Sequence, residues 1–190
     1  MKTLNGGVLK SLFYLLFVAI FLTACAQSNH DTADKPGVEK PDIDINAAVM
    51  ANNLEAIKDH IEAGTDINLK DPLTGSTPLI SAVTFEKTEI AKTLIDGGAD
   101  LTVKNNDGAT PLHAAAFFGR VELVQMLIDA NADKTLRNNF GATPRESIMG
   151  PFADIKPIYE MLLQQLGVYG LELDMEELEK ARPIIAEMLK

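Results

Sequence analysis

An internal repeat of 33 residues limits what this chain can fold into more than any other feature of its sequence. Residues 77–82, 110–115 and 143–147 begin 33 positions apart, and each stretch opens with Thr-Pro. A period of this length is typical of solenoids, because one unit of such a size cannot bury its own apolar face and has to stack on its neighbours. The repeat therefore predicts a row of similar units that share one apolar core.

A second marker has the same period and extends it toward the amino terminus. Residues 96–100 and 129–133 each follow a Thr-Pro by nineteen positions, and residues 62–66 carry the same pattern one unit earlier. Counting back once more reaches residues 43–48, a degenerate first copy. On these residues the chain resembles the ankyrin-repeat family over residues 42–166. The resemblance implies an all-α solenoid of about four repeats, each built from two helices and a hairpin loop.

The residues at the repeat markers favour helix starts and helix ends. Thr77 and Thr110 are suited to cap free backbone amides, and the proline after each stands in the first turn, where a missing N–H costs nothing. Residues 121–128 carry apolar side chains at helical spacing, which predicts the second helix of the third copy. Asn131 ends that helix at the place where Gly98 ends the corresponding helix one repeat earlier.

The fourth copy departs from the pattern. Arg145 stands where the two preceding copies have leucine, and Gly150-Pro151 interrupts the first helix of the copy. An apolar helical period resumes over residues 155–162, which we expect to form the second half of a capping copy.

Residues 167–190 contain a further helix. Asp174 begins it with a capping sequence, and Pro183 should kink or restart it. Because the open end of a solenoid exposes apolar surface, we expect this helix to cap the stack; the alternative is that it binds a partner.

Residues 1–24 have the organisation of an export signal. Lys2 and Lys10 flank a polar start, and residues 12–22 are eleven unbroken apolar residues. This run is too short for a membrane span, which requires about 20 residues. We therefore expect a cleaved signal peptide rather than a transmembrane helix.

The export signal ends in Leu22-Thr23-Ala24-Cys25, which resembles the lipobox of bacterial lipoproteins. That resemblance implies cleavage before Cys25 and attachment of lipid, including palmitate, to this residue. Ala26 and Gln27 stand where an aspartate would retain the protein at the inner membrane, so the same resemblance implies the outer membrane, facing the periplasm. The alternative is an ordinary secretory signal with a chance cysteine. Residues 25–41 are polar and without apolar period, which predicts a flexible tether.

The chain is acidic, with 27 Asp and Glu against 17 Lys and Arg. Residues 1–24 hold two lysines and no acid, so the net charge of -10 becomes -12 after cleavage. Nucleic acid is therefore not expected as a partner. The charge either favours association with basic proteins or keeps the domain soluble.

The sequence carries no catalytic signature. It has no Gly-x-Ser-x-Gly, no His-Glu-x-x-His, no phosphate-binding glycine loop and no second cysteine for zinc. We therefore expect no enzymatic activity, no cofactor, no metal and no small-molecule substrate. His113 corresponds by resemblance to the family's structural histidine, which bonds to an adjacent loop. His60 is expected to be a solvated helix residue.

The resemblance places partner recognition on the concave face, at the ends of the first helices and at the hairpin tips. The helix-end candidates, several of them apolar, are Met50, Thr84, Phe85, Phe117 and Phe118. The tip candidates are Leu73, Thr74, Asn105, Asp107, Asn139 and Phe140. We expect one solvent-facing stripe made of Met50 and the aromatic residues Phe85, Phe117 and Phe118, unless Phe117 or Phe118 packs against its neighbour instead.

Two functions are compatible with these features. The first is a tethered module that binds an envelope or periplasmic protein as an accessory or chaperone-like factor. Small exported bacterial ankyrin proteins that the chain resembles have been linked to oxidative-stress resistance. The second is an immunity protein that neutralises a phospholipase effector of type VI secretion.

Overall fold

The computed structural model describes residues 41–190, which lie within one compact unit, Thr32–Lys190. Every regular element in this range is a helix, so the prediction of an all-α fold is confirmed. Cys25, the export signal and the tether up to residue 40 lie outside the described residues. None of the helices within residues 41–190 is long and apolar enough to cross a membrane.

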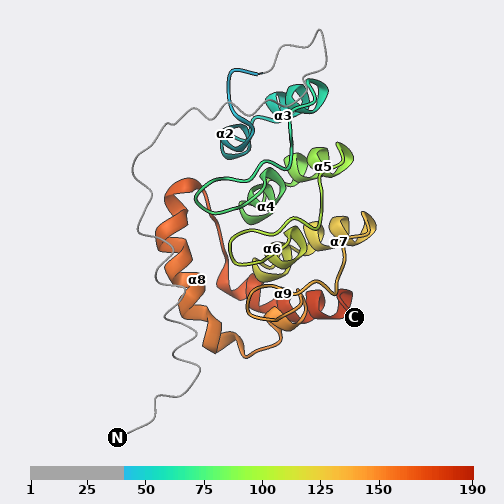
Figure 1. The fold of residues 1–190 in the computed structure, drawn as a ribbon. Coiled ribbons are helices and arrows are strands. Elements are labelled where there is room, and N and C mark those ends of the chain that lie inside the picture. The colour runs from blue at the N-terminus through green and yellow to red at the C-terminus, as the bar shows by residue number, and fades with distance from the viewer. Residues whose placement is uncertain (1–40) are drawn as a thin grey trace, which may run out of the picture. The chain divides into compact units, whose positions relative to one another are not determined.

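Three helix pairs form two layers (Figure 1). The first helices of the repeats are α2 (Ile45–Met50), α4 (Pro78–Thr84) and α6 (Pro111–Phe117). The second helices are α3 (Leu54–Glu62), α5 (Thr88–Asp96) and α7 (Val121–Asp129). Each first helix packs on the next first helix and each second helix on the next second helix. The core lies between the layers and is built from aliphatic side chains, with Ala82 and Ala115 where the first helices approach each other.

The expected caps open the first helices. The Oγ1 of Thr77 accepts from the backbone N–H of Ile80 at 3.2 Å, and the Oγ1 of Thr110 accepts from that of His113 at 3.4 Å. The proline after each threonine stands at the start of the helix. The sequence therefore fixes the helix starts through side-chain bonds that the repeat itself supplies.

Two buried histidines join neighbouring segments. The Nε2 of His113 bonds the backbone oxygen of Ala142 at 3.0 Å, as expected for a structural histidine. The expectation for His60 is wrong, because this side chain is fully buried. Its Nε2 bonds the backbone oxygen of Ile43 at 2.8 Å and its Nδ1 bonds the Oγ1 of Thr65 at 3.1 Å. His60 thus ties the first residues of the stack to the second helix of the first repeat.

Hairpin loops, called fingers below, run from each second helix to the next repeat over residues 63–77, 97–110 and 130–145. The first finger is one residue longer than the second, and the extra residue lies in its tip. Its tip closes between Asp71 and Ser76 at 2.8 Å, whereas the next one closes between Asn105 and Ala109 at 3.0 Å. The insertion therefore leaves the register of the helices unchanged.

The fourth repeat is assembled differently from the expectation. The short 3-10 helix η2 (Glu146–Ile148) packs on α6 in the place of a first helix. The place of the second helix, against α7, is taken by α9 (Met175–Met188). Helix α8 (Phe152–Leu166), which contains the residues expected to fill that place, instead leads through η3 (Gly167–Tyr169) to the chain that returns to α9.

Helix α9 caps the stack with one buried face, which is apolar except for Arg182. Its buried residues follow helical spacing: Leu178, Ala181, Arg182 and Ile185. Asp174 caps its first turn, and the helix continues through Pro183 without the expected break. Its last carbonyls are bonded as well, because Arg145 Nε donates to Ala186 O and Lys134 Nζ donates to Met188 O, each at 2.9 Å. The arginine that replaces leucine in the fourth copy therefore holds the capping helix.

Candidate protein-binding surface

The five helix-end candidates stand where the first helices end. Met50 ends α2, Thr84 ends α4 with Phe85 just after it, and Phe117 ends α6 with Phe118 just after it. Met50 has 37% of its surface exposed, and the other four residues are half-buried. In the family, this side of the first-helix layer, away from the second helices, is the concave face, and the name is kept below.

The concave face already holds a helix. Figure 1 shows α8 on the side of the first-helix layer away from α3, α5 and α7, running along the stack. Tyr159 of α8 places its ring 4.7 Å from the ring of Phe117, between centroids, and its hydroxyl donates to the backbone oxygen of Phe117 at 2.7 Å. Phe117 is therefore covered by the chain's own helix.

Arg182 of α9 also bonds the hydroxyl group of Tyr159. Its Nη1 donates to the hydroxyl of Tyr159 at 3.3 Å and its Nη2 donates to the backbone oxygen of Gly150 at 2.9 Å. The guanidinium also lies over the ring of Phe152, 5.7 Å from the centroid. We call Phe117, Phe152, Tyr159 and Arg182 the tyrosine latch. Its members come from α6, α8 and α9, so it joins the third repeat, the capping helix and the helix on the concave face.

Burial raises the pKa of Tyr159 to about 12, and Arg182 opposes part of this increase. Because the folded value lies above the ordinary 10.0, the neutral phenol stabilises the latch fully below pH 10, and this contribution is lost as the pH rises through about 12. We expect an alkaline titration followed by phenolate absorbance to show a late step that is absent from Tyr159→Phe. A profile unchanged in that variant would contradict the latch.

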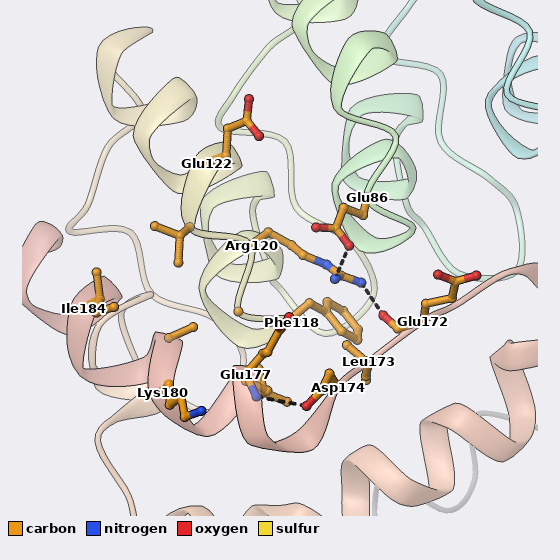
Figure 2. Close-up of a pocket in the computed structure, with 14 residues that line it drawn as sticks. Glu86, Phe118, Arg120, Glu122, Glu172, Leu173, Asp174, Glu177, Lys180 and Ile184 are labelled. Atoms are coloured by element: carbon orange, nitrogen blue, oxygen red, sulfur yellow. Dashed lines mark hydrogen bonds and ion pairs between the residues drawn. The ribbon is translucent and has the colours of Figure 1, made fainter.

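Phe118 points to a different surface from Phe117. The two rings meet edge to face, 5.0 Å between centroids, and Phe118 lines an open groove of about 620 Å³. Figure 2 shows this groove between the turn that precedes α7, the returning chain at Glu172–Asp174 and α9. The expected single aromatic stripe is therefore divided, with Phe117 inside the latch and Phe118 in the groove.

The rim of the groove is acidic. Five carboxylates line it: Glu86, Glu122, Glu172, Asp174 and Glu177. Arg120 crosses it, pairing with the carboxylate of Glu86 and donating to the backbone oxygen of Glu172 at 2.7 Å. Burial lowers the pKa of Arg120, while the nearby Glu86 raises it. Arg120 thus attaches the returning chain to the repeats. Lys180 is the other basic residue of the lining, so acidic side chains outnumber basic ones.

The finger tips divide into exposed apolar residues and polar residues used inside the fold. Leu73 and Phe140 have 48% and 49% of their surfaces exposed. The Thr74 hydroxyl donates to Asp71 at 2.9 Å. Asn105 accepts from two backbone N–H groups of its own finger. These two polar candidates therefore shape their own tips.

Asn139 and Asp107 connect one finger with the next. The Asn139 backbone N–H donates to Asp107 O and its Nδ2 donates to Asn106 O, each at 2.9 Å. Burial raises the pKa of the half-buried Asp107 carboxyl. The same bonds recur one finger earlier, where Asn106 donates to Thr74 O at 3.1 Å and to Leu73 O at 2.8 Å. The fingers are thus held in a ladder by asparagines 33 residues apart.

Sequence reasoning missed the tyrosine latch and the groove. Both depend on the path of residues 150–174, and a helical apolar period does not say which neighbour a helix contacts. Within residues 41–190 no group of three or more His, Cys, Asp and Glu side chains is arranged to hold a metal ion.

Comparison with known proteins defines the class. The family model described as ankyrin repeats in three copies matches residues 45–138. These residues are therefore ankyrin repeats, which indicates a protein–protein interaction module.

Individual relatives match part of the chain. The ankyrin repeat-containing protein P1E11.10 of Schizosaccharomyces pombe is 48% identical over 65 residues, and protein phosphatase 1 regulatory subunit 27 of Mus musculus is 41% identical over 64 residues. Each match covers 34% of this chain, and the chain spans only 30% and 41% of these relatives. Among solved structures, the ankyrin repeat domain of Bcl-3, of the IkappaB family, superposes with a TM-score of 0.54 at 28% identity, over 60% of this chain and 50% of that one.

Proposed function

We propose that the protein is a non-catalytic binding module, attached by lipid at Cys25 to the periplasmic face of the outer membrane, that binds a partner protein through its concave face. The observation that carries the binding surface is the exposure of Met50 and Leu73, two apolar side chains at the open end of the first-helix layer and at a finger tip. Exposed apolar side chains ringed by polar ones favour protein association. The sequence Leu22-Thr23-Ala24-Cys25, which follows an apolar run, supports attachment to the membrane.

Affinity capture from the native envelope tests the proposal. The bait is the full chain, beside a variant with Met50→Ser, Leu73→Ser and Phe85→Ala, which changes exposed or half-buried side chains only. We expect one protein to be retained by the wild type and lost by this variant. Ile184→Ser, at a side chain 52% exposed on the groove side of α9, is the matched control and should retain the partner.

The other outcomes are equally informative. Loss only in Ile184→Ser would contradict the concave face and move the binding site to the groove. A phospholipase as the captured protein would favour the immunity role over an accessory role. Cys25→Ala should release the chain from the membrane fraction and abolish palmitate labelling; a variant that stays lipid-labelled would contradict the anchor.

A further inference from the structure

Helix α8 lies on the concave face, where the family binds partners, yet it is held there by few contacts. Only Tyr159 of its fifteen residues is buried, and its other apolar side chains are half-buried or exposed. In α9, by contrast, four residues are buried, and Leu178, Ala181 and Ile185 among them are apolar. A helix that buries one side chain can leave its site by local opening while the repeat core stays folded.

The chain at both ends of α8 is also exposed. Gly150 and Pro151 precede the helix, and residues 167–170 follow it, all with exposed side chains or backbone. Arg182 holds the first end, through its bond to Gly150 O and its place over the ring of Phe152. Helix α8 is therefore a weakly held segment between two elements that pack on the repeats, η2 and α9.

The site that Tyr159 occupies requires an aromatic ring that carries a hydroxyl group. The backbone oxygen of Phe117 requires a donor, and Nη1 of the buried Arg182 requires an acceptor. One phenol hydroxyl satisfies both atoms, while the ring packs on Phe117. A phenylalanine would fill the space but leave two buried polar groups without their bonds. The latch therefore selects a tyrosine presented from a helix.

We propose that α8 is a displaceable occupant of the concave face, and that the partner binds there with an amphipathic helix whose tyrosine replaces Tyr159 against Phe117 and Arg182. This inference rests on the proposed function, since it names the kind of partner that the concave face accepts. Helix-in-groove recognition uses a few anchoring side chains on one helix face, and α8 shows the arrangement that fits.

The probe for the test is a labelled synthetic peptide of residues 150–170, added in trans to the full chain. We expect the peptide to bind Tyr159→Ala, in which the chain's own helix has lost its anchor, and to bind the wild type at least about tenfold more weakly, because α8 competes. A peptide with phenylalanine in place of tyrosine should lose about tenfold in affinity, which is the effect of a hydrogen-bonded hydroxyl.

Hydrogen exchange provides the control. In Tyr159→Ala the amides of α8 should exchange faster than in the wild type, while those of α4 and α6 stay protected. A second host, Ile155→Ser with Ile158→Ser, loosens α8 at half-buried positions without touching Phe117, and should bind the peptide as well.

Two results would overturn the inference. One is a host with released α8 and folded repeats that does not bind the peptide. The other is equal binding of the peptide to the wild type and to Tyr159→Ala, which would place the contact elsewhere. Neither result bears on capture through Met50 and Leu73, so failure of this inference can be told apart from failure of the proposed function.

Discussion

Replacing Gly108 by alanine is expected to lower the free energy of unfolding by about 3 kcal/mol, whereas the same change at Gly141 should lower it by about 1 kcal/mol. The two glycines hold the same position in consecutive fingers, 33 residues apart, and have similar left-handed backbones, with φ of 71° and 76°. The change costs both sites the same backbone strain, so their difference measures something else.

That difference in unfolding free energy arises from the hydrogen bonds by which Asn139 joins its finger to the preceding one. A Cβ on Gly108 would stand 2.7 Å from the backbone nitrogen and 2.8 Å from the Cγ of Asn139, where nothing can move aside without breaking the bonds to Asp107 and Asn106. A Cβ on Gly141 meets nothing within 4 Å, because no further finger follows. Only the first change therefore separates two fingers.

Urea unfolding of both variants, followed by circular dichroism, measures the effect. Adding Asn139→Ala to Gly108→Ala should reduce the cost of the glycine change, because the side-chain part of the clash is then gone. Equal losses at Gly108 and Gly141 would show that backbone conformation alone matters and that the ladder contributes nothing.

The repeat part of the fold was predictable because its determinants are local and recur. Thr77 and Thr110 bond amides three residues on, and Gly98 and Asn131 adopt left-handed backbone, with φ of 86° and 63°, after their helices. Such short-range chemistry can be read from one repeat and checked in the next. His60 was misjudged because its burial depends on a residue seventeen positions away, Ile43.

The end of the chain was not predictable in the same way. Residues 155–166 and 175–188 both have helical apolar periods, and either segment satisfies the requirement that α7 be covered. The sequence did carry one indication of where α9 packs, in the turn between the first and the second helix of each repeat. Asn52, Glu86 and Gly119 hold equivalent left-handed positions, and Leu178 of α9 packs where a side chain on Gly119 would stand. Only the turn that α9 crosses has glycine.

The sequence predicted where the candidate surface lies, but not which of its residues are exposed. The family resemblance locates the first-helix ends, but whether Phe117 faces solvent depends on Tyr159, 42 residues away. Two of the polar tip candidates, Asp107 and Asn139, are likewise determined by bonds between neighbouring fingers. Recognition residues read from one repeat are therefore correct only where no other part of the chain has taken the same place.

Truncating one side chain on α8 and one on α9, and comparing the free energies of unfolding, identifies the helix that completes the fourth repeat. Ile185→Ala on α9 should lower the free energy of unfolding by about 3 to 4 kcal/mol, because Ile185 is fully buried in the core and truncation leaves a cavity. Ile158→Ala on α8 should lower it by about 1 kcal/mol or less, since the side chain is half-buried and its helix can adjust.

Ile184→Ala is the matched control on α9, one residue from Ile185 but 52% exposed, and should have almost no effect. The three variants remove the same atoms from positions that differ only in what they contact. If Ile158→Ala cost as much as Ile185→Ala, α8 would be part of the repeat core, and its displacement by a partner would be too costly for the binding that we infer. A large cost at Ile185 and a small one at Ile158 would leave α8 as a helix that can open while the repeats stay folded.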